Sequence, residues 1–434
     1  MVKKNRESNI EMLRILCTLL IISSHFLGIG HISQKDSCFY LMVNIMMSDL
    51  SRVACTVFII ISAWFSLDKS TNISKVFHVW LTTIMYMVPL TIIGHHYNLF
   101  AEDMYVVKCS FLPVSYGYGA AWFTSVYIVL MLISPLLNYI LQNVQRNIMK
   151  FYLFTYFCAF SLFATIFHEN GKYALELVAF SFVYLLTGYI KKYKVVNERF
   201  LSTKYACIMF MCSWLFISAL MTMGTYFSGN VFYDEMFKFG NFYYGYFQTI
   251  PNLICAFSLF FIFLNFKIRN RQIINKLASL SFGIIIFHNV PGWNEFFYSS
   301  LLSCTWHARH LKDIKLLIYA GVGILVIYIV GCVVEILRKS VCNLLIENRK
   351  WYRDICYYIN MCYSGEVEID YLTGSVIALV LVVYLLTIYS VFWNLENGSV
   401  MATVLSAFLG SVFLVISVVI LYRRTSKMVS VIVK

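Results

Sequence analysis

Charged residues are scarce in this chain, since Asp, Glu, Lys and Arg make up only 13% of its 434 residues, and proline occurs five times. A soluble domain carries about 25% charged and about 45–50% apolar residues, whereas 60% of this chain is hydrophobic. The sequence has no CxxC pair, Gly-rich phosphate loop, GxSxG elbow or HExxH pair. It therefore gives no support to a metal site, ATP-driven transport, serine hydrolysis or zinc proteolysis.

Long apolar runs fill the chain instead, and the mean hydropathy is +0.74. Runs of about 20 apolar residues predict transmembrane helices. The expected fold is an all-α, polytopic transmembrane helical bundle that has membrane lipid as its surroundings. The twelve predicted spans are residues 10–29, 43–66, 76–95, 121–141, 149–168, 174–190, 205–227, 243–265, 277–297, 315–337, 373–393 and 400–422.

The net charge of +13 is distributed unevenly between the two sides of these spans. With a cytoplasmic N-terminus, 25 of the 34 Lys and Arg residues fall on cytoplasmic segments and seven on the opposite side, while Arg14 and Arg52 lie within spans. This asymmetry follows the positive-inside rule and predicts a multi-pass protein of the cell membrane with both termini in the cytoplasm. The basic charge then faces anionic lipid headgroups, so no nucleic-acid partner is expected.

The first span, IEMLRILCTLLIISSH, carries Arg14 and His25 within an apolar run. Eleven residues make about three helical turns, which places both on one face about 16 Å apart. Ionisable groups inside a membrane are costly, so this face is expected to meet protein or a cavity. Glu11, three residues before Arg14, is placed to pair with it. A neutral imidazole suits proton transfer from a hydroxyl; a packed histidine and a snorkelling arginine are the structural alternatives.

The second span offers Asp49 and Arg52, one turn apart, followed by VACTVFIIISAW with Ser62 near its end. Asp49 and Arg52 are predicted near the outer end of the span, at roughly the depth of His25. A carboxylate and a guanidinium there would bind sugar hydroxyls or orient His25. A purely structural ion pair is the alternative.

The fourth and ninth spans each carry one further candidate. Trp122 begins WFTSVYIVLMLISP, where an aromatic residue either anchors the membrane boundary or lines an acceptor site. His288 lies in SLSFGIIIFHN, near the membrane centre and somewhat deeper than His25. Two histidines at broadly similar depth suit a shared polar cavity, whereas a buried histidine satisfied by a neighbouring helix is the alternative.

Taken in order, these four segments resemble the acyltransferase-3 family of integral membrane acyltransferases, over about the first 340 residues. The chain departs from the family pattern at Ala63, where glycine is usual, and at Ile285, where tyrosine is common. The stretch DKSTNISKVFHVW also lacks the family's arginine-rich turn. The matching residues are Ile10, Glu11, Leu13, Arg14 and His25; Arg52, Phe58 and Ser62; Trp122, Phe123 and Pro135; and Ser281, Phe282, Gly283, Ile284 and His288.

The resemblance implies a bacterial O-acyltransferase that moves an acyl group, usually acetyl, to a hydroxyl of an envelope glycan or a lipid-linked sugar. The donor implied is cytoplasmic acetyl-CoA or another acyl-CoA, as a substrate rather than a bound cofactor. It further implies that His25 is the catalytic base, that Arg14 positions the donor and that Asp49 assists His25. The residues expected to bind substrate are Arg52, Ser62, Trp122 and His288.

Three regions are expected: a ten-helix membrane domain over residues 1–339, a cytoplasmic connector over 340–372 and a C-terminal transmembrane hairpin over 373–434. The sequence leaves open the role of the hairpin, the oligomeric state, the acceptor glycan and the acyl chain length. Spans with intramembrane charges are also typical of a transporter or flippase of lipid-linked sugars. A catalytically silent relative that binds glycans is a third interpretation.

Overall fold

The computed structural model describes residues 7–30, 38–67, 74–97, 122–162, 165, 175–194, 202–226, 247–290, 293–311 and 313–364, and the isolated positions 375, 382, 390, 419, 420 and 422. These residues form helices and contain no β-strand. The longer helices are α1 (Ser8–Ile29), α2 (Cys38–Ser66), α3 (Ser74–His96), α5 (Trp122–Asn143), α6 (Arg146–Tyr156), α8 (Leu175–Tyr193), α10 (Thr203–Tyr226), α12 (Ile250–Asn265), α17 (Asp313–Cys342) and α18 (Lys350–Ser364). The shorter elements are α13 (Gln272–Ala278), α14 (Ser281–Phe287), α15 (Trp293–Glu295), α16 (Cys304–His310) and the π-helical turns η2 (Phe157–Leu162), η3 (Phe296–Leu301) and η4 (Asn343–Glu347).

Five of the described helices are long and apolar enough to cross a membrane, which confirms the helical membrane class. They are Ser8–Gly28, Ile45–Ser66, Trp122–Asn143, Thr203–Leu220 and Ile314–Glu347. Helices also lie on the other predicted spans up to residue 337, although α12 has only 16 residues. The predicted hairpin over residues 373–434 falls outside the described residues, apart from the isolated positions.

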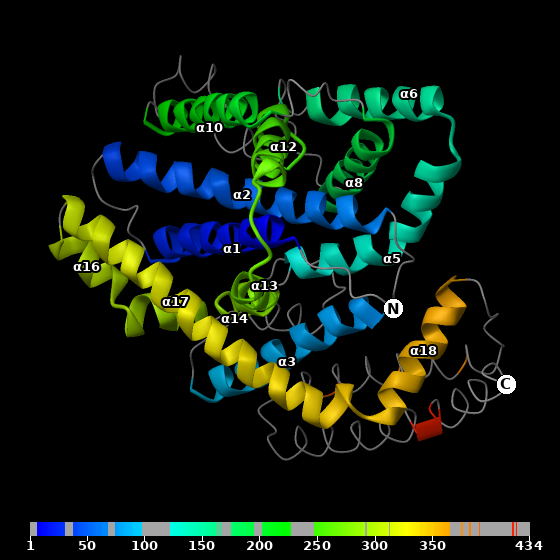
Figure 1. The fold of residues 1–434 in the computed structure, drawn as a ribbon. Coiled ribbons are helices and arrows are strands. Elements are labelled where there is room, and N and C mark those ends of the chain that lie inside the picture. The colour runs from blue at the N-terminus through cyan, green and yellow to red at the C-terminus, as the bar shows by residue number, and fades with distance from the viewer. Residues whose placement is uncertain are drawn as a thin grey trace.

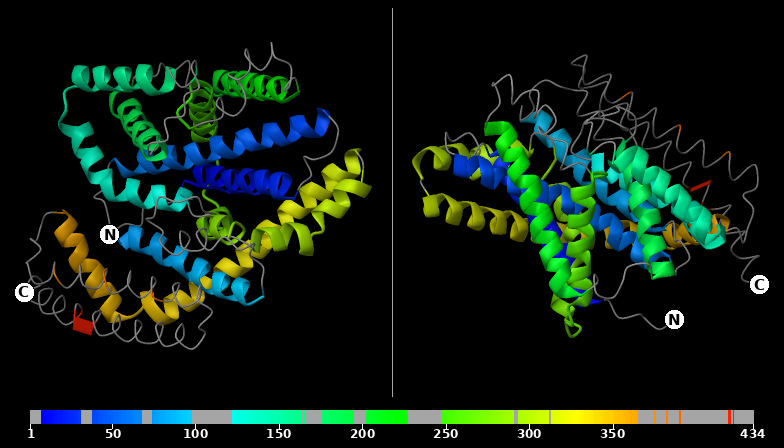
Figure 2. Two further views of the ribbon diagram at one scale, coloured as in Figure 1. Left: turned by 180° about the vertical axis from the view of Figure 1, so that it is seen from behind. Right: turned by 90° about the horizontal axis from the view of Figure 1, so that it is seen from above.

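Helix α1 lies in the middle of the bundle, between α2 on one side and α13, α14 and α17 on the other (Figure 1). Figure 2 gives the arrangement from behind and from above. Leu13 and Cys17 are fully buried in the main core with α2 and α12, while Ile22 and Phe26 are fully buried against α17. Both flanks of α1 therefore meet protein, which is the environment that its ionisable residues require.

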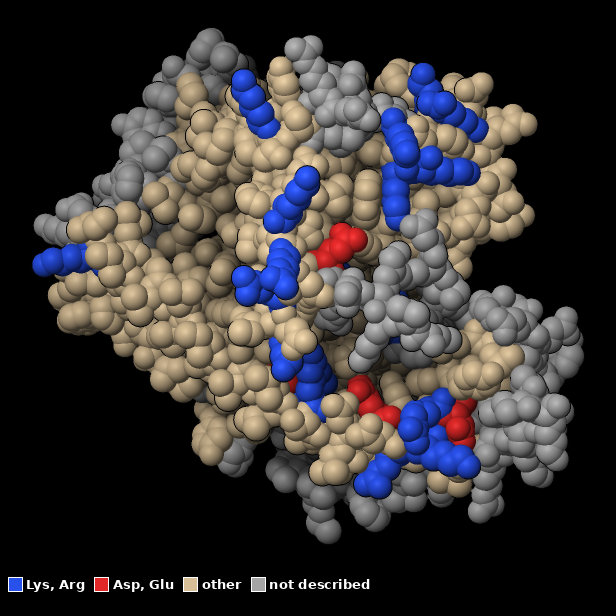
Figure 3. All heavy atoms as spheres, in the orientation of Figure 1, with Lys and Arg blue, Asp and Glu red and all other residues tan. Residues whose placement is uncertain are grey.

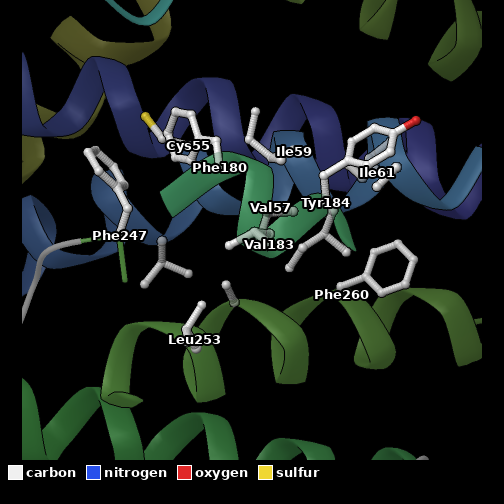
Figure 4. Packing of buried hydrophobic residues seen from close by; sticks show 14 of the residues in the cluster. Cys55, Val57, Ile59, Ile61, Phe180, Val183, Tyr184, Phe247, Leu253 and Phe260 are labelled. Atoms are coloured by element: carbon white, nitrogen blue, oxygen red, sulfur yellow. The ribbon is translucent and has the colours of Figure 1, made fainter. Parts of the chain in front are cut away.

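The main apolar core forms where α2, α5, α8 and α12 meet. Figure 4 shows side chains of α2, α8 and α12 that fill it, among them Val57, Val183 and Phe260. All three are fully buried. Because lipid tails are as apolar as these side chains, such helices associate through close packing more than through exclusion from solvent.

Polar side chains hold α1 alongside the segment 270–288. Ser8 Oγ donates to Asn275 Oδ1 over 2.9 Å and accepts the backbone N–H of Arg271 over 2.8 Å. At the far end of α1, His25 meets His288. The two segments therefore run in the same direction, side by side.

The ninth predicted span, residues 277–297, is not one continuous helix. Helix α13 ends at Ala278, and α14 ends at Phe287, where His288 is its C-cap. Pro291 and Gly292 follow in the sequence, and the residue before a proline is disfavoured in helical conformation. The apolar run therefore breaks just after His288. A helix end inside a membrane is a common location for a polar site, provided that protein covers it.

A buried ion pair ties α3, α14 and α17 together. Arg338 donates through Nε and Nη2 to Glu335 over 2.7 and 2.9 Å. The hydroxyl of Tyr86 donates to Glu335 Oε2 over 2.6 Å. The carboxylate lies directly over Gly283, where any Cβ would collide with it. Glycine at this position therefore lets α14 approach the paired charges of α17.

On the face drawn in Figure 3, the basic side chains of the described residues are unevenly distributed. In Figure 3 they cover the middle and right of the view, where α6, α13 and α18 lie, and few appear at the left, near α16. Among the described residues, Arg309 and Lys315 are the basic residues on segments predicted to be outside. This distribution agrees with the charge asymmetry of the sequence.

The close approach of α17 to α1 gives a stability prediction. A Cβ at Gly323 would collide with the buried ring of Phe26, whereas nothing lies within 4 Å of one at Gly321, two residues earlier on the exposed face. We expect Gly323→Leu to destabilise the protein by about 1–3 kcal/mol through overpacking. Thermal unfolding in detergent measures this, with Gly321→Leu as the matched control. Equal melting temperatures for the two variants would contradict the packing described.

Candidate active site

Two histidines from helices distant in sequence meet inside the bundle. His25 Nδ1 lies 3.0 Å from His288 Nε2, and the ring centroids are 5.1 Å apart. His25 comes from the last turns of α1, and His288 ends α14 with only 1% of its surface exposed. The structure thus brings together the two histidines that the sequence predicted at similar depth.

The hydrogen bonds of this pair determine where its protons lie. His288 Nδ1 is 2.7 Å from the carbonyl oxygen of Ile284. A carbonyl can only accept, so in a neutral pair Nδ1 of His288 carries its proton and Nε2 is an acceptor. His25 must then donate through Nδ1, which leaves His25 Nε2 with a free lone pair. In this arrangement Nε2 of His25 is able to accept a proton, while the hydrogen bond to His288 fixes the orientation of the His25 ring.

A cleft of about 680 Å³ opens beside α1, between α2, α3, α5, α14 and α17. One part of its wall is polar and comes largely from helix ends on the side where α1 begins, whereas the other part is mainly aromatic. The polar part is lined by Arg14, Lys75, His78, Ser279, Ser281, Glu335, Lys339, Glu347 and Tyr352. The aromatic part is lined by Phe58, Ser62, Phe123, Tyr127, Phe282 and Ile285.

Three cations line the cleft. Arg14 is one of them, and its Nη1 lies 3.8 Å from Glu11 Oε2, which confirms the predicted pairing of these two residues. Lys339 reaches the wall from α17 and donates to the carbonyl of Ser279 over 2.7 Å. Lys75 enters from the first turn of α3. Lys339 Nζ also lies 3.8 Å from Glu335 Oε1, so the lining holds these three cations together with two carboxylates, a small excess of positive charge.

The two carboxylates of the cleft wall are already engaged. Glu335 is held by Arg338, and Glu347 lies 2.6 Å from His78 Nδ1. Their charges are therefore largely offset by their partners.

The cleft ends close to the histidine pair. Ile285 belongs to its wall, and His288 follows three residues later. Three residues advance a helix by about 4.5 Å, or roughly one turn. Neither histidine is among the residues that line the cleft, so a ligand that fills it comes to within about one turn of His288, with Arg14 further down the wall.

Ser62 and Trp122 lie on different sides of the aromatic residues. Ser62 lines the cleft, donates to the carbonyl of Phe58 over 2.9 Å and lies 3.0 Å from the hydroxyl of Tyr127. Trp122 packs against Phe247, with ring centroids 5.4 Å apart, and belongs to the surroundings of the main core. Ser62 is thus a wall residue of the cleft, and Trp122 supports its aromatic part from behind.

Asp49 and Arg52 lie elsewhere. Asp49 is buried and accepts a hydrogen bond from Ser218 of α10 over 3.3 Å, with Arg52 close enough to act on its charge. Helix α2 separates α10 from α1 (Figure 1). The structure therefore does not bring Asp49 to His25, whose partner is His288 on α14.

Several residues of the site were not predicted from the sequence. Ser281, Tyr127 and Lys339 line the cleft, and Glu335 anchors its wall. The pair of charges in VVEILRK, at the end of a predicted span, is a signal that would have pointed to Glu335, because intramembrane charges are rare and functional. Ser281 is part of the Ser-Phe-Gly segment, which gives it no role of its own, and Tyr127 carries no signal of this kind.

Comparison with known proteins agrees with the sequence motifs. The family model described as an acyltransferase domain, that of the acyltransferase-3 proteins, matches residues 7–335, about three quarters of the chain. No curated protein and no solved structure matches. The matched region contains α1, the cleft-lining parts of α2, α3 and α5, and both histidines. The chain therefore belongs to the acyltransferase-3 family of membrane acyltransferases.

Proposed function

We propose that the protein transfers an acyl group, usually acetyl, from cytoplasmic acyl-CoA to a hydroxyl of an envelope glycan or lipid-linked sugar. The observation that carries the proposal is His25 Nε2, left as a proton acceptor by the hydrogen bonds of His288. Its partner His288 lies about one helical turn beyond Ile285, which lines the same cleft as Arg14. Membership of the family supplies the reaction type.

The donor is proposed to occupy the cleft. Its phosphates lie at the polar end, near Lys75 and Lys339, where cations attract them. The flexible arm passes Arg14, Ser281 and Phe282, and the acyl end extends past Ile285 toward the histidine pair. The uneven distribution of basic residues on the face drawn in Figure 3 supports a cytoplasmic location for the mouth and for both termini, in a bacterial cell membrane.

The reaction needs one base that later acts as an acid. His25 Nε2 takes the proton of the acceptor hydroxyl as the oxygen attacks the thioester carbonyl. His288 accepts the Nδ1–H of His25 throughout and stabilises the imidazolium that forms. When the carbon–sulfur bond breaks, the proton passes from His25 to the leaving thiolate. The products are an ester and free CoA.

Transfer of label tests this proposal. We expect isotopically labelled acetyl-CoA, added to membranes that contain the protein, to label envelope glycan, and membranes without it to give no such label. The same assay with membranes lacking glycan acceptor is the control. Absence of label, together with loss of sugar-lipid export on deletion of the protein, would select a transporter instead.

Substitution of the two histidines separates their roles. We expect His25→Ala to lower kcat by about 10²–10⁴-fold, because the base is lost. His288→Ala should cost about 1.5–3 kcal/mol, or roughly 10- to 150-fold in rate, because a hydrogen bond to the developing imidazolium is lost. His288→Gln should retain most of the activity, since its amide oxygen can accept the same proton. Steady-state kinetics on variants shown to insert normally measures these changes, and full activity of His25→Ala would refute the assignment.

A further inference from the structure

Two polar atoms in the wall of the cleft have no hydrogen-bond partner among the described residues. They are Oγ of Ser281 and Nε of Arg14, and both atoms are buried. Ser281 as a whole is only 3% exposed, yet it lines the cleft together with Arg14. A buried polar atom without a partner destabilises the fold, so a pair of them in one wall needs an explanation.

Other serines of the same cleft are satisfied by the protein itself. Ser279 Oγ donates to the carbonyl of Lys276 over 2.7 Å, and Ser62 Oγ donates to the carbonyl of Phe58 over 2.9 Å. Ser281 opens α14, is more deeply buried than these two serines, and lacks such a bond. Its hydroxyl and the N–H of Arg14 are therefore two donors that are not used within the described protein, which suits a ligand that brings an acceptor.

The distance from Ser281 to His288 along α14 indicates which hydrogen-bond acceptor of the donor lies beside Ser281. Seven residues separate Ser281 from His288, which corresponds to about 10 Å along the helix. An extended chain covers this distance in roughly eight covalent bonds. Counted from the thioester carbon of acyl-CoA, roughly eight bonds lead to the second amide group of the pantetheine arm. Amide carbonyls are strong acceptors and would be costly to bury without donors.

We propose that Ser281 is a donor-positioning residue, whose hydroxyl, together with Nε–H of Arg14, binds the second amide carbonyl of the pantetheine arm. This assignment rests on the proposed function, and it deepens it by naming how the neutral part of the donor is recognised. The bond contributes affinity for the donor in the ground state and the transition state alike, so it lowers KM for acyl-CoA more than it changes kcat.

The test compares two serines and two thioesters. Ser281→Ala should raise KM for acetyl-CoA roughly 5- to 10-fold and leave kcat within about two-fold of the wild type. Ser340→Ala is the matched control, because Ser340 lies on the exposed face of α17 outside the cleft and its hydroxyl donates to the carbonyl of Ile336; it should leave KM unchanged. The second thioester, S-acetyl-N-acetylcysteamine, ends before the second amide, so Ser281→Ala and the wild type should use it equally well.

Two outcomes would contradict the role of Ser281, and a third would contradict the proposed function. An unchanged KM for acetyl-CoA in Ser281→Ala, in an otherwise active enzyme, means that the hydroxyl binds water and that the inference is wrong. An equal rise in KM for both thioesters means that the substitution acts on the cleft as a whole and also contradicts it. A wild-type protein that transfers no acetyl group from acetyl-CoA refutes the proposed function itself.

Discussion

The hydrogen bond between His25 and His288 is the interaction on which the site depends. A polar group inside an apolar bundle must form its hydrogen bonds within the protein, and the two imidazoles bond to each other. The carbonyl of Ile284 fixes the proton of His288, which fixes the proton of His25 in turn. One backbone carbonyl therefore determines which nitrogen of His25 is basic. The geometry requires that α14 end at this level, which the break before Pro291 ensures.

Packing around α1 keeps this bond in place. Ser8 attaches the start of α1 to the segment after α12. Near the other end of α1, Phe26 packs against α17. Glu335, held by Arg338, supports α14 from behind through its contact with Gly283. The helix that carries His25 and the segment that carries His288 are thus held at both ends. Rigid support of this kind keeps reacting groups in a productive geometry.

Much of the fold was predictable, because the length of apolar runs and the positions of charges determine helices in a membrane. The pairing of Glu11 with Arg14 followed from helical spacing, and the similar depth of His25 and His288 followed from counting along the spans. The lateral arrangement of helices did not follow, since spacing along one helix does not say which neighbour its faces meet. Asp49 was therefore expected near His25 and lies against α10 instead.

The protonation of His25 tests the account most directly. Solid-state ¹⁵N NMR of the protein in lipid bilayers, with histidine rings labelled and a His25→Ala spectrum subtracted, reports on each ring nitrogen separately. We predict a protonated Nδ1 and an unprotonated Nε2 for His25 at neutral pH, with magnetisation transfer from the Nδ1 proton to Nε2 of His288. A His25 protonated at Nε2, or one without contact to His288, would contradict the account.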